Sequence, residues 1–181
     1  MNGEIVKKFK FYAIWSDDKI EQWLNDMAKQ GLHLQSVNLF NRYTFVRDEP
    51  ADVSYQLDFM TKLDRSGEYY GLFIDAGWEH VIEFTGWQYW RKSYINGKPP
   101  EIFTDVESKL KKFQRVLTVF AVCHLPLIPL FASPKIFNTI QEQQPFGENV
   151  IFTSLGIILT MNLYFLAKLT LRIQRLKRDR K

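Results

Sequence analysis

The chain has 181 residues, of which 46% are hydrophobic and 15% aromatic, and its formal net charge is +4. This composition excludes an intrinsically disordered chain, and the length suffices for one folded domain with additional segments but not for two full-sized domains. The single cysteine, Cys123, excludes an internal disulfide and a cysteine-rich metal site.

The N-terminal region predicts a strand, a helix and a hairpin in succession. The sequence VKKFKFYAI alternates apolar and basic side chains, which is typical of a strand and not of a secretory signal peptide. Ser16 then provides an N-cap, and Gly31 provides the C′ residue that ends the helix. Between them the apolar residues recur at the spacing of one helix face: Ile20, Trp23, Leu24 and Met27. The segments LHLQSV and RYTFVR follow as the strands of a hairpin.

The same pattern recurs further along the chain, which indicates an internal duplication. VSYQLDFM corresponds to KFKFYAIW, and WQYWRK corresponds to RYTFVR. Gly77 stands 46 residues after Gly31, so the helix ends are repeated as well. We predict an α+β domain over residues 1–100, in which two β-α-β-β units share one antiparallel sheet with both helices on one face. A ferredoxin-like βαββαβ sheet is the alternative.

Residues with catalytic or metal-binding chemistry are few in this predicted domain. His33 and His80 each follow a helix-ending glycine, but the duplication explains their pairing without a function. Glu79 and His80 point to opposite faces of a strand, which disfavours a shared metal ion. The domain contains no phosphate-binding loop and no nucleophile motif. We therefore predict no catalytic residues, no metal site, no cofactor and no enzymatic activity.

Aromatic side chains crowd the last predicted hairpin of the domain. Trp87, Tyr89 and Trp90 lie there, and Arg91 follows them. Core packing accounts for most of these rings, but their alternation predicts that one large ring lies outside the helix-covered face. An exposed apolar face of a sheet indicates a binding partner. Trp87, Tyr89, Trp90 and Arg91 are therefore the candidate partner surface.

Two long, largely uncharged segments follow a helical connector over residues 101–115. They run over residues 116–134 and 149–171, each long enough to span a membrane as a helix, and neither has the polar stripe of a soluble helix. Basic residues before the first and after the second place both termini in the cytoplasm and residues 135–148 outside. The sequence thus predicts a transmembrane hairpin in the cell membrane, with the basic tail 172–181 near anionic headgroups.

One ionisable side chain lies inside the first predicted span. His124 is near its middle, and Pro126 and Pro129 follow. An ionisable group at that depth is costly, so it is a functional candidate by default. In the structural interpretation, His124 forms a hydrogen bond across the hairpin to Thr160 or Asn162. The alternatives are that His124 is a proton-responsive site or that it contacts another protein. His124 and Asn162 form the candidate intramembrane polar site.

The segments KFKFYAIW, MAKQGLHL, SYQLDF, DAGWEHV and WQYWRK, in this order, resemble the bacterial family designated domain of unknown function 2812, over roughly residues 5–110. Members often carry C-terminal membrane hairpins and are commonly encoded beside PadR-type transcriptional repressors. The resemblance therefore implies a membrane-tethered accessory protein of a regulatory or envelope-stress unit. It implies no catalytic residues, because none are established for the family.

Two functional hypotheses follow from the sequence. The first is a membrane-anchored cytoplasmic protein-interaction module whose partner is a cytoplasmic protein, such as a PadR-type repressor, while the two spans and the basic tail bind membrane lipid. The alternative is a membrane stress sensor or membrane-complex subunit that uses the transmembrane hairpin. Neither requires direct nucleic-acid binding, because the domain before the spans is nearly neutral in charge.

Overall fold

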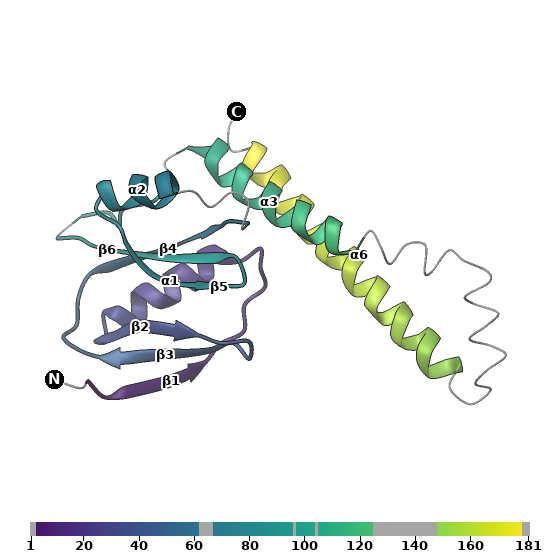
Figure 1. Ribbon diagram of the computed structural model, residues 1–181, viewed down its shortest axis with the longest axis horizontal. Helices are drawn as coiled ribbons and strands as arrows, with labels where there is room; N and C mark the ends of the chain where they lie inside the picture. Colours follow the sequence, from purple (N-terminus) through teal and green to yellow (C-terminus); the bar gives the residue numbers. More distant parts are fainter. Residues whose placement is uncertain (1–2, 62–66, 96, 104, 125–147, 179–181) are drawn as a thin grey trace. The chain divides into compact units, whose positions relative to one another are not determined.

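The computed structural model describes residues 3–61, 67–95, 97–103, 105–124 and 148–178 (Figure 1). The chain divides into two compact units, Met1–Lys112 and Phe113–Lys181. The described residues of the first unit form, before α3, the following elements: β1 (Ile5–Phe9), α1 (Asp17–Ala28), β2 (Leu32–Val37), β3 (Arg42–Arg47), β4 (Val53–Phe59), α2 (Gly67–Asp75), β5 (Glu79–Phe84) and β6 (Trp87–Ser93). Helix α3 (Val106–His124) crosses the boundary, and α6 (Glu148–Arg178) lies in the second unit.

The first unit contains two antiparallel three-stranded sheets. The strand order is β1-β3-β2 in the first sheet and β4-β6-β5 in the second. In both sheets the last strand of the β-α-β-β unit lies between the other two, and the helix connects the two outer strands. The predicted α+β class and the antiparallel pairing are therefore confirmed.

Local irregularities occur at equivalent positions of the two repeats. The register between β2 and β3 shifts between Leu34 and Ser36, and the register between β5 and β6 shifts between His80 and Ile82. Gly31 and Gly77 end α1 and α2 with φ of 75° and 80°, as expected for C′ residues in the left-handed conformation. Equivalent bulges and equivalent glycines support the duplication more strongly than strand order alone.

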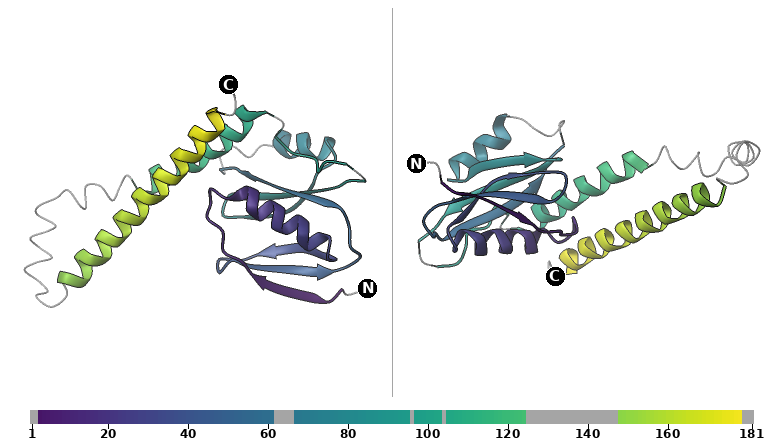
Figure 2. Two further views of the ribbon diagram at one scale, coloured as in Figure 1. Left: turned by 180° about the vertical axis from the view of Figure 1, so that it is seen from behind. Right: turned by 90° about the horizontal axis from the view of Figure 1, so that it is seen from below.

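The prediction of one shared sheet is wrong, and a single ferredoxin-like sheet is not formed either. The two sheets meet where β2 contacts β5, without a hydrogen-bonded ladder between them. Helix α1 contacts β2 of the first sheet and β4 of the second (Figure 2). Helix α2 packs on the face of the second sheet that carries Trp90. The two helices therefore do not cover one common face.

Side chains of helix α1 form hydrogen bonds with the outer edge of β4. Asn25 Oδ1 accepts a hydrogen bond from the Tyr55 N–H at 2.6 Å, and Glu21 Oε1 accepts one from the Leu57 N–H at 2.8 Å. Residues four apart on a helix match N–H groups two apart on a strand, because both spacings are about 6–7 Å. The edge of β4 is thus capped by a helix and is not open to another strand.

The described residues of the second unit are the C-terminal part of α3 and helix α6, which pack antiparallel. The rings of Phe120 in α3 and Phe165 in α6 stack at 4.2 Å, and the Arg172 guanidinium lies 5.8 Å from the ring centre of Phe113. Of the described residues, Gly156–Arg178 alone is long and apolar enough to cross a membrane by length and composition. Most of the first predicted span and the loop after it, residues 125–147, lie outside the described residues.

Candidate functional site

The aromatic hairpin predicted as a partner surface lies in the core. Trp87, Tyr89 and Trp90 are all buried, and Trp90 has no exposed surface. Phe59 packs on Trp87 with ring centres 5.4 Å apart, and Phe73 of α2 packs on Trp90 at 4.8 Å. The expectation of an exposed large ring is therefore wrong, because both faces of the second sheet are covered.

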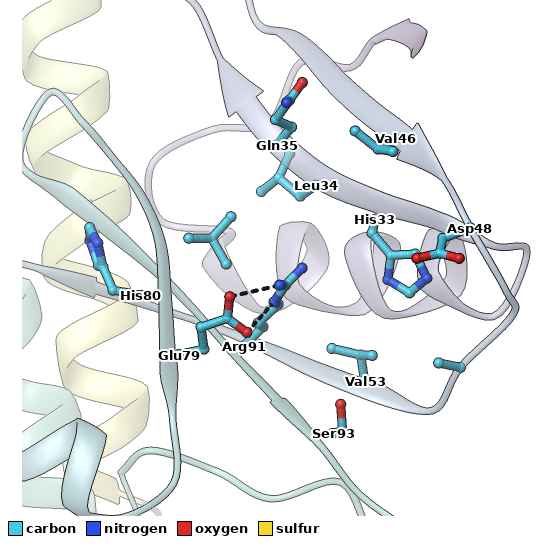
Figure 3. A pocket seen from close by; sticks show the side chains of 12 residues that line it. His33, Leu34, Gln35, Val46, Asp48, Val53, Glu79, His80, Arg91 and Ser93 are labelled. Carbon is cyan, nitrogen blue, oxygen red and sulfur yellow. Dashed lines mark hydrogen bonds and ion pairs between the residues drawn. The ribbon is translucent and has the colours of Figure 1, made fainter. Parts of the chain in front are cut away.

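Arg91, the fourth residue of that predicted surface, lines a pocket at the junction of the two sheets (Figure 3). The cavity has a volume of about 510 Å³, within the range of ligand pockets. Side chains and backbone from both repeats line it: His33, Leu34, Gln35, Val46, Asp48, Ala51, Val53, Glu79, His80, Val81, Arg91 and Ser93. Both strand bulges contribute, because Gln35 and Val81 are their extra residues. Bulges of this kind are often found next to functional sites.

The pocket contains an ion pair, and Asp48 is a further acidic residue in its lining. Arg91 donates two hydrogen bonds to the Glu79 carboxylate, at 2.8 Å from Nε and 2.7 Å from Nη2. These bonds lower the pKa of Glu79 below its usual value, and they raise the pKa of Arg91. The Arg91 side chain is 32% exposed and that of Glu79 is 63% exposed, so the carboxylate side of the pair faces solvent.

The two histidines of the pocket region have different surroundings. The His33 Nε2 atom lies 2.9 Å from the Glu49 carbonyl oxygen, at the pocket wall. The His80 ring lies on the opposite side of β5 from Glu79 and contacts Gln88 Oε1 at 2.8 Å (Figure 3). The predicted opposite orientation of Glu79 and His80 is confirmed. Within the described residues, no group of three or more potential ligands is placed to hold a metal ion.

A second polar cluster is buried between α1, β4 and the start of α3. Lys112 Nζ lies 2.5 Å from Asp17 Oδ2 and donates to the Leu57 carbonyl oxygen at 2.9 Å. Burial lowers the pKa of Lys112, but the negative charges of Asp17 and Glu21 outweigh this effect and hold the pKa above its usual value. Burial raises the pKa of Glu21 to about 8, although Lys112 opposes the shift. The cluster therefore joins the ion pair of Asp17 and Lys112 with the Glu21 carboxyl group, whose pKa is raised.

Sequence reasoning missed this cluster because its members look like ordinary surface residues. Asp17 stands in the first turn of a helix, where acids are common, and Lys112 stands in a run of basic residues. The two residues are 95 positions apart, so no local pattern relates them. The pocket gave no sequence signal either, apart from the paired His33 and His80.

The predicted intramembrane polar pair is not formed in the second unit. The His124 Nδ1 atom lies 2.6 Å from the Phe120 carbonyl oxygen of its own helix, and the ring stacks on Phe120 at 4.0 Å. Thr160 donates to carbonyl oxygens within α6, those of Gly156 and Ile157. His124 is thus bonded within α3 and not across to Asn162.

Comparison with known proteins identifies a family. A family model described as a protein of unknown function, DUF2812, matches residues 16–125, more than half of the chain. The chain belongs to the DUF2812 family. No curated protein and no solved structure matches it.

The DUF2812 match contains both the pocket and the buried polar cluster of Asp17, Glu21 and Lys112. It begins just before α1, so it includes Asp17 and all residues of the pocket, and it ends at the last residues of α3. Strand β1 and helix α6 lie outside the match. Membership confirms the resemblance, but the match carries no statement about a membrane or a PadR-type repressor.

Proposed function

We propose that this DUF2812 protein is a membrane-anchored binding module. The second unit holds the chain in the cell membrane as a helical hairpin, with both termini in the cytoplasm. The first unit presents the junction pocket to a cytoplasmic protein partner. The exposed apolar surface of α6 is the observation that carries this proposal.

The surface of α6 fits a lipid environment better than water. Seven large apolar side chains between residues 157 and 171 are exposed: Ile157, Ile158, Leu159, Met161, Leu163, Tyr164 and Leu171. An exposed apolar surface of this extent is rare in soluble proteins. Basic residues follow at the C-terminal end, including Arg175, Lys177 and Arg178. This distribution agrees with a span whose C-terminus lies on the cytoplasmic side.

The pocket supports binding because its ion pair can be exchanged. A carboxylate of a partner that replaced Glu79 would receive the same two hydrogen bonds from Arg91, and such bidentate pairs are among the stronger polar interactions. Glu79 would then return to solvent, which its present exposure permits. The chemistry favours an acidic segment of a partner protein. A PadR-type repressor is the first partner to test, because the family resemblance implies a regulatory unit.

The test is recovery of partners from membranes that contain the full-length chain. The protein is cross-linked in cells, extracted with a mild detergent and purified by affinity, and the partners are identified by mass spectrometry. Arg91→Ala removes the proposed contact. Arg47→Ala is the matched control, because Arg47 forms a similar exposed ion pair with Glu4 at 2.7 Å and does not line the pocket.

We expect the wild type and Arg47→Ala to recover the same cytoplasmic protein and Arg91→Ala to lose it. Equal recovery by all three chains would contradict the pocket as the binding site. Recovery of membrane proteins alone would support the alternative, a subunit of a membrane complex.

A further inference from the structure

One end of the first sheet carries large apolar side chains in solvent. Phe9 and Phe11 at the end of β1 are 67% and 70% exposed, and Leu39 and Phe40 in the turn between β2 and β3 are 77% and 75% exposed. The two segments are adjacent, because Phe9 pairs with Arg42 and the Lys10 N–H donates to the Asn41 carbonyl oxygen at 3.1 Å. We call this group, together with Lys7, Lys10 and Arg42, the apolar tip.

The turn that carries Leu39 and Phe40 is an ordered structure. Asn38 Oδ1 accepts hydrogen bonds from the N–H groups of Phe40 at 3.0 Å and Arg42 at 3.2 Å. The Asn41 N–H donates to the Asn38 carbonyl oxygen at 3.0 Å, and Asn41 adopts a φ of 53°. Asparagine supports such turns through its side-chain carbonyl and tolerates the left-handed conformation. The turn thus holds two apolar side chains outward in a defined position.

The chain segments that carry the tip contribute charges of one sign. Lys7, Lys10 and Arg42 are exposed beside the apolar side chains. The two chain segments that form this end of the sheet, residues 5–16 and 32–47, contain no acidic residue. Exposed apolar side chains surrounded by basic groups are typical of surfaces that enter the headgroup region of anionic bilayers.

We propose that the apolar tip binds the anionic lipid surface of the membrane in which the second unit is anchored. The inference rests on the proposed membrane anchor, which keeps the first unit at a high effective concentration near lipid. A second copy of the chain fits less well, because it would bring two basic tips together, and lysines on an edge strand such as β1 oppose strand pairing. The tip would thus restrict the orientation of the first unit on the membrane.

The experiment places a fluorescent probe at the tip of the full-length chain. Cys123→Ser removes the single cysteine, and Leu39→Cys then allows labelling of the tip. Glu68→Cys on α2 is the control, because Glu68 is also exposed and lies outside the tip. The labelled chains are reconstituted into nanodiscs of phosphatidylcholine, with or without phosphatidylglycerol, that carry a quencher in the lipid. Thermal unfolding checks that each variant is folded.

We expect the lipid quencher to quench the Leu39 probe in anionic discs and to leave the Glu68 probe unaffected. Lys7→Glu with Lys10→Glu should reduce the quenching to the control level, and so should salt of about 1 M, where the Debye length is about 3 Å. Quenching that is equal in neutral and anionic discs would overturn the anionic assignment. A Leu39 probe that stays unquenched, or is shielded only after a cytoplasmic protein is added, would overturn the lipid surface altogether.

The proposed anchor can be judged in the same experiment. A chain that does not enter the discs contradicts the membrane anchor. A chain that enters them and leaves the Leu39 probe in water contradicts the lipid-binding tip alone.

Discussion

Lys112 Nζ lies 2.5 Å from Asp17 Oδ2, and both side chains are buried in the first unit. The pair connects the first turn of α1 with α3, the helix that continues into the second unit. The folded unit thus extends to Lys112, beyond the end at residue 100 that the sequence predicts. Any shortened chain meant to contain the whole first unit should therefore include Lys112.

Lys112→Met should strongly destabilise the first unit. The substitution leaves Asp17 buried without its counter-charge and removes the donor to the Leu57 carbonyl, a loss of about 3–5 kcal/mol in comparable buried pairs. Lys111→Met is the control, because Lys111 forms an exposed pair with Glu107 that contributes about 0–1 kcal/mol. Denaturant unfolding of the full-length chain in detergent measures both. Equal effects of the two substitutions would show that the buried pair has no special role.

The stability of the first unit should fall as pH rises from about 5 to about 8. Burial raises the pKa of Glu21 from 4.5 to about 8, so in this window the folded state binds a proton that the unfolded state has released. The stabilisation that Glu21 contributes is therefore fully present below its pKa in the unfolded chain. It is lost as the pH rises through its pKa in the folded chain. The slope cannot exceed about 1.4 kcal/mol per pH unit.

Glu21→Gln tests the same group directly. Glutamine keeps an oxygen that can accept the Leu57 N–H bond but cannot ionise. Unfolding curves measured at several pH values should show a smaller slope for Glu21→Gln than for the wild type between pH 5 and 8. Any pH dependence that does not come from Glu21 is common to both chains and cancels in the difference. Parallel curves for the two chains would contradict a protonated Glu21.

Asn25→Ala should lower the free energy of unfolding by about 1–3 kcal/mol, because it removes the side chain that accepts the hydrogen bond of the Tyr55 N–H at the edge of β4. Gln22 on the same helix is exposed, so Gln22→Ala should change the free energy of unfolding by less than about 0.5 kcal/mol. Hydrogen exchange of the Tyr55 amide reports the edge itself. Protection of that amide in Asn25→Ala as strong as in the wild type would mean that the cap is unimportant.

Gly31→Ala should destabilise the chain more than Gly77→Ala, although the two glycines are equivalent in the duplication. Both have positive φ, which costs a residue with a Cβ about 1–2 kcal/mol. A Cβ at Gly31 would also approach the backbone oxygen of Asp48, whereas a Cβ at Gly77 would meet only the end of the flexible Lys92 side chain, at 3.5 Å. Thermal unfolding distinguishes the two, and equal losses would contradict the difference in packing.

Sequence patterns predicted the duplication and the helix ends but not how the repeats assemble. Gly31 and Gly77 are local signals, and each ends a helix in the structure as predicted. The first strand was predicted over VKKFKFYAI, but β1 ends at Phe9. The assembly of the repeats involves hydrogen bonds from Glu21 and Asn25, which cap the edge of β4 from a helix more than 25 residues away. No periodicity encodes such a long-range hydrogen bond, so one shared sheet was the simpler expectation.

The candidate site was predicted less well for a related reason. Alternation along β6 assigns Trp87 and Trp90 to opposite faces correctly, but it does not reveal that both faces are covered. Arg91 is the one residue of the predicted surface that lines the pocket. The apolar tip was not predicted from the sequence. Leu39 and Phe40 lie in a turn between two strands, and the sequence pattern does not show that both side chains are exposed.

Alkaline carbonate extraction of membranes from cells that express the full-length chain tests the proposed membrane anchor. We expect the wild type to stay in the membrane pellet. Leu159→Lys with Leu163→Lys should release it, because each charge inside a span costs about 2.5–3.5 kcal/mol, whereas Leu72→Lys with Ile95→Lys, two exposed positions of the first unit, should not. Wild-type protein in the soluble fraction would contradict the anchor.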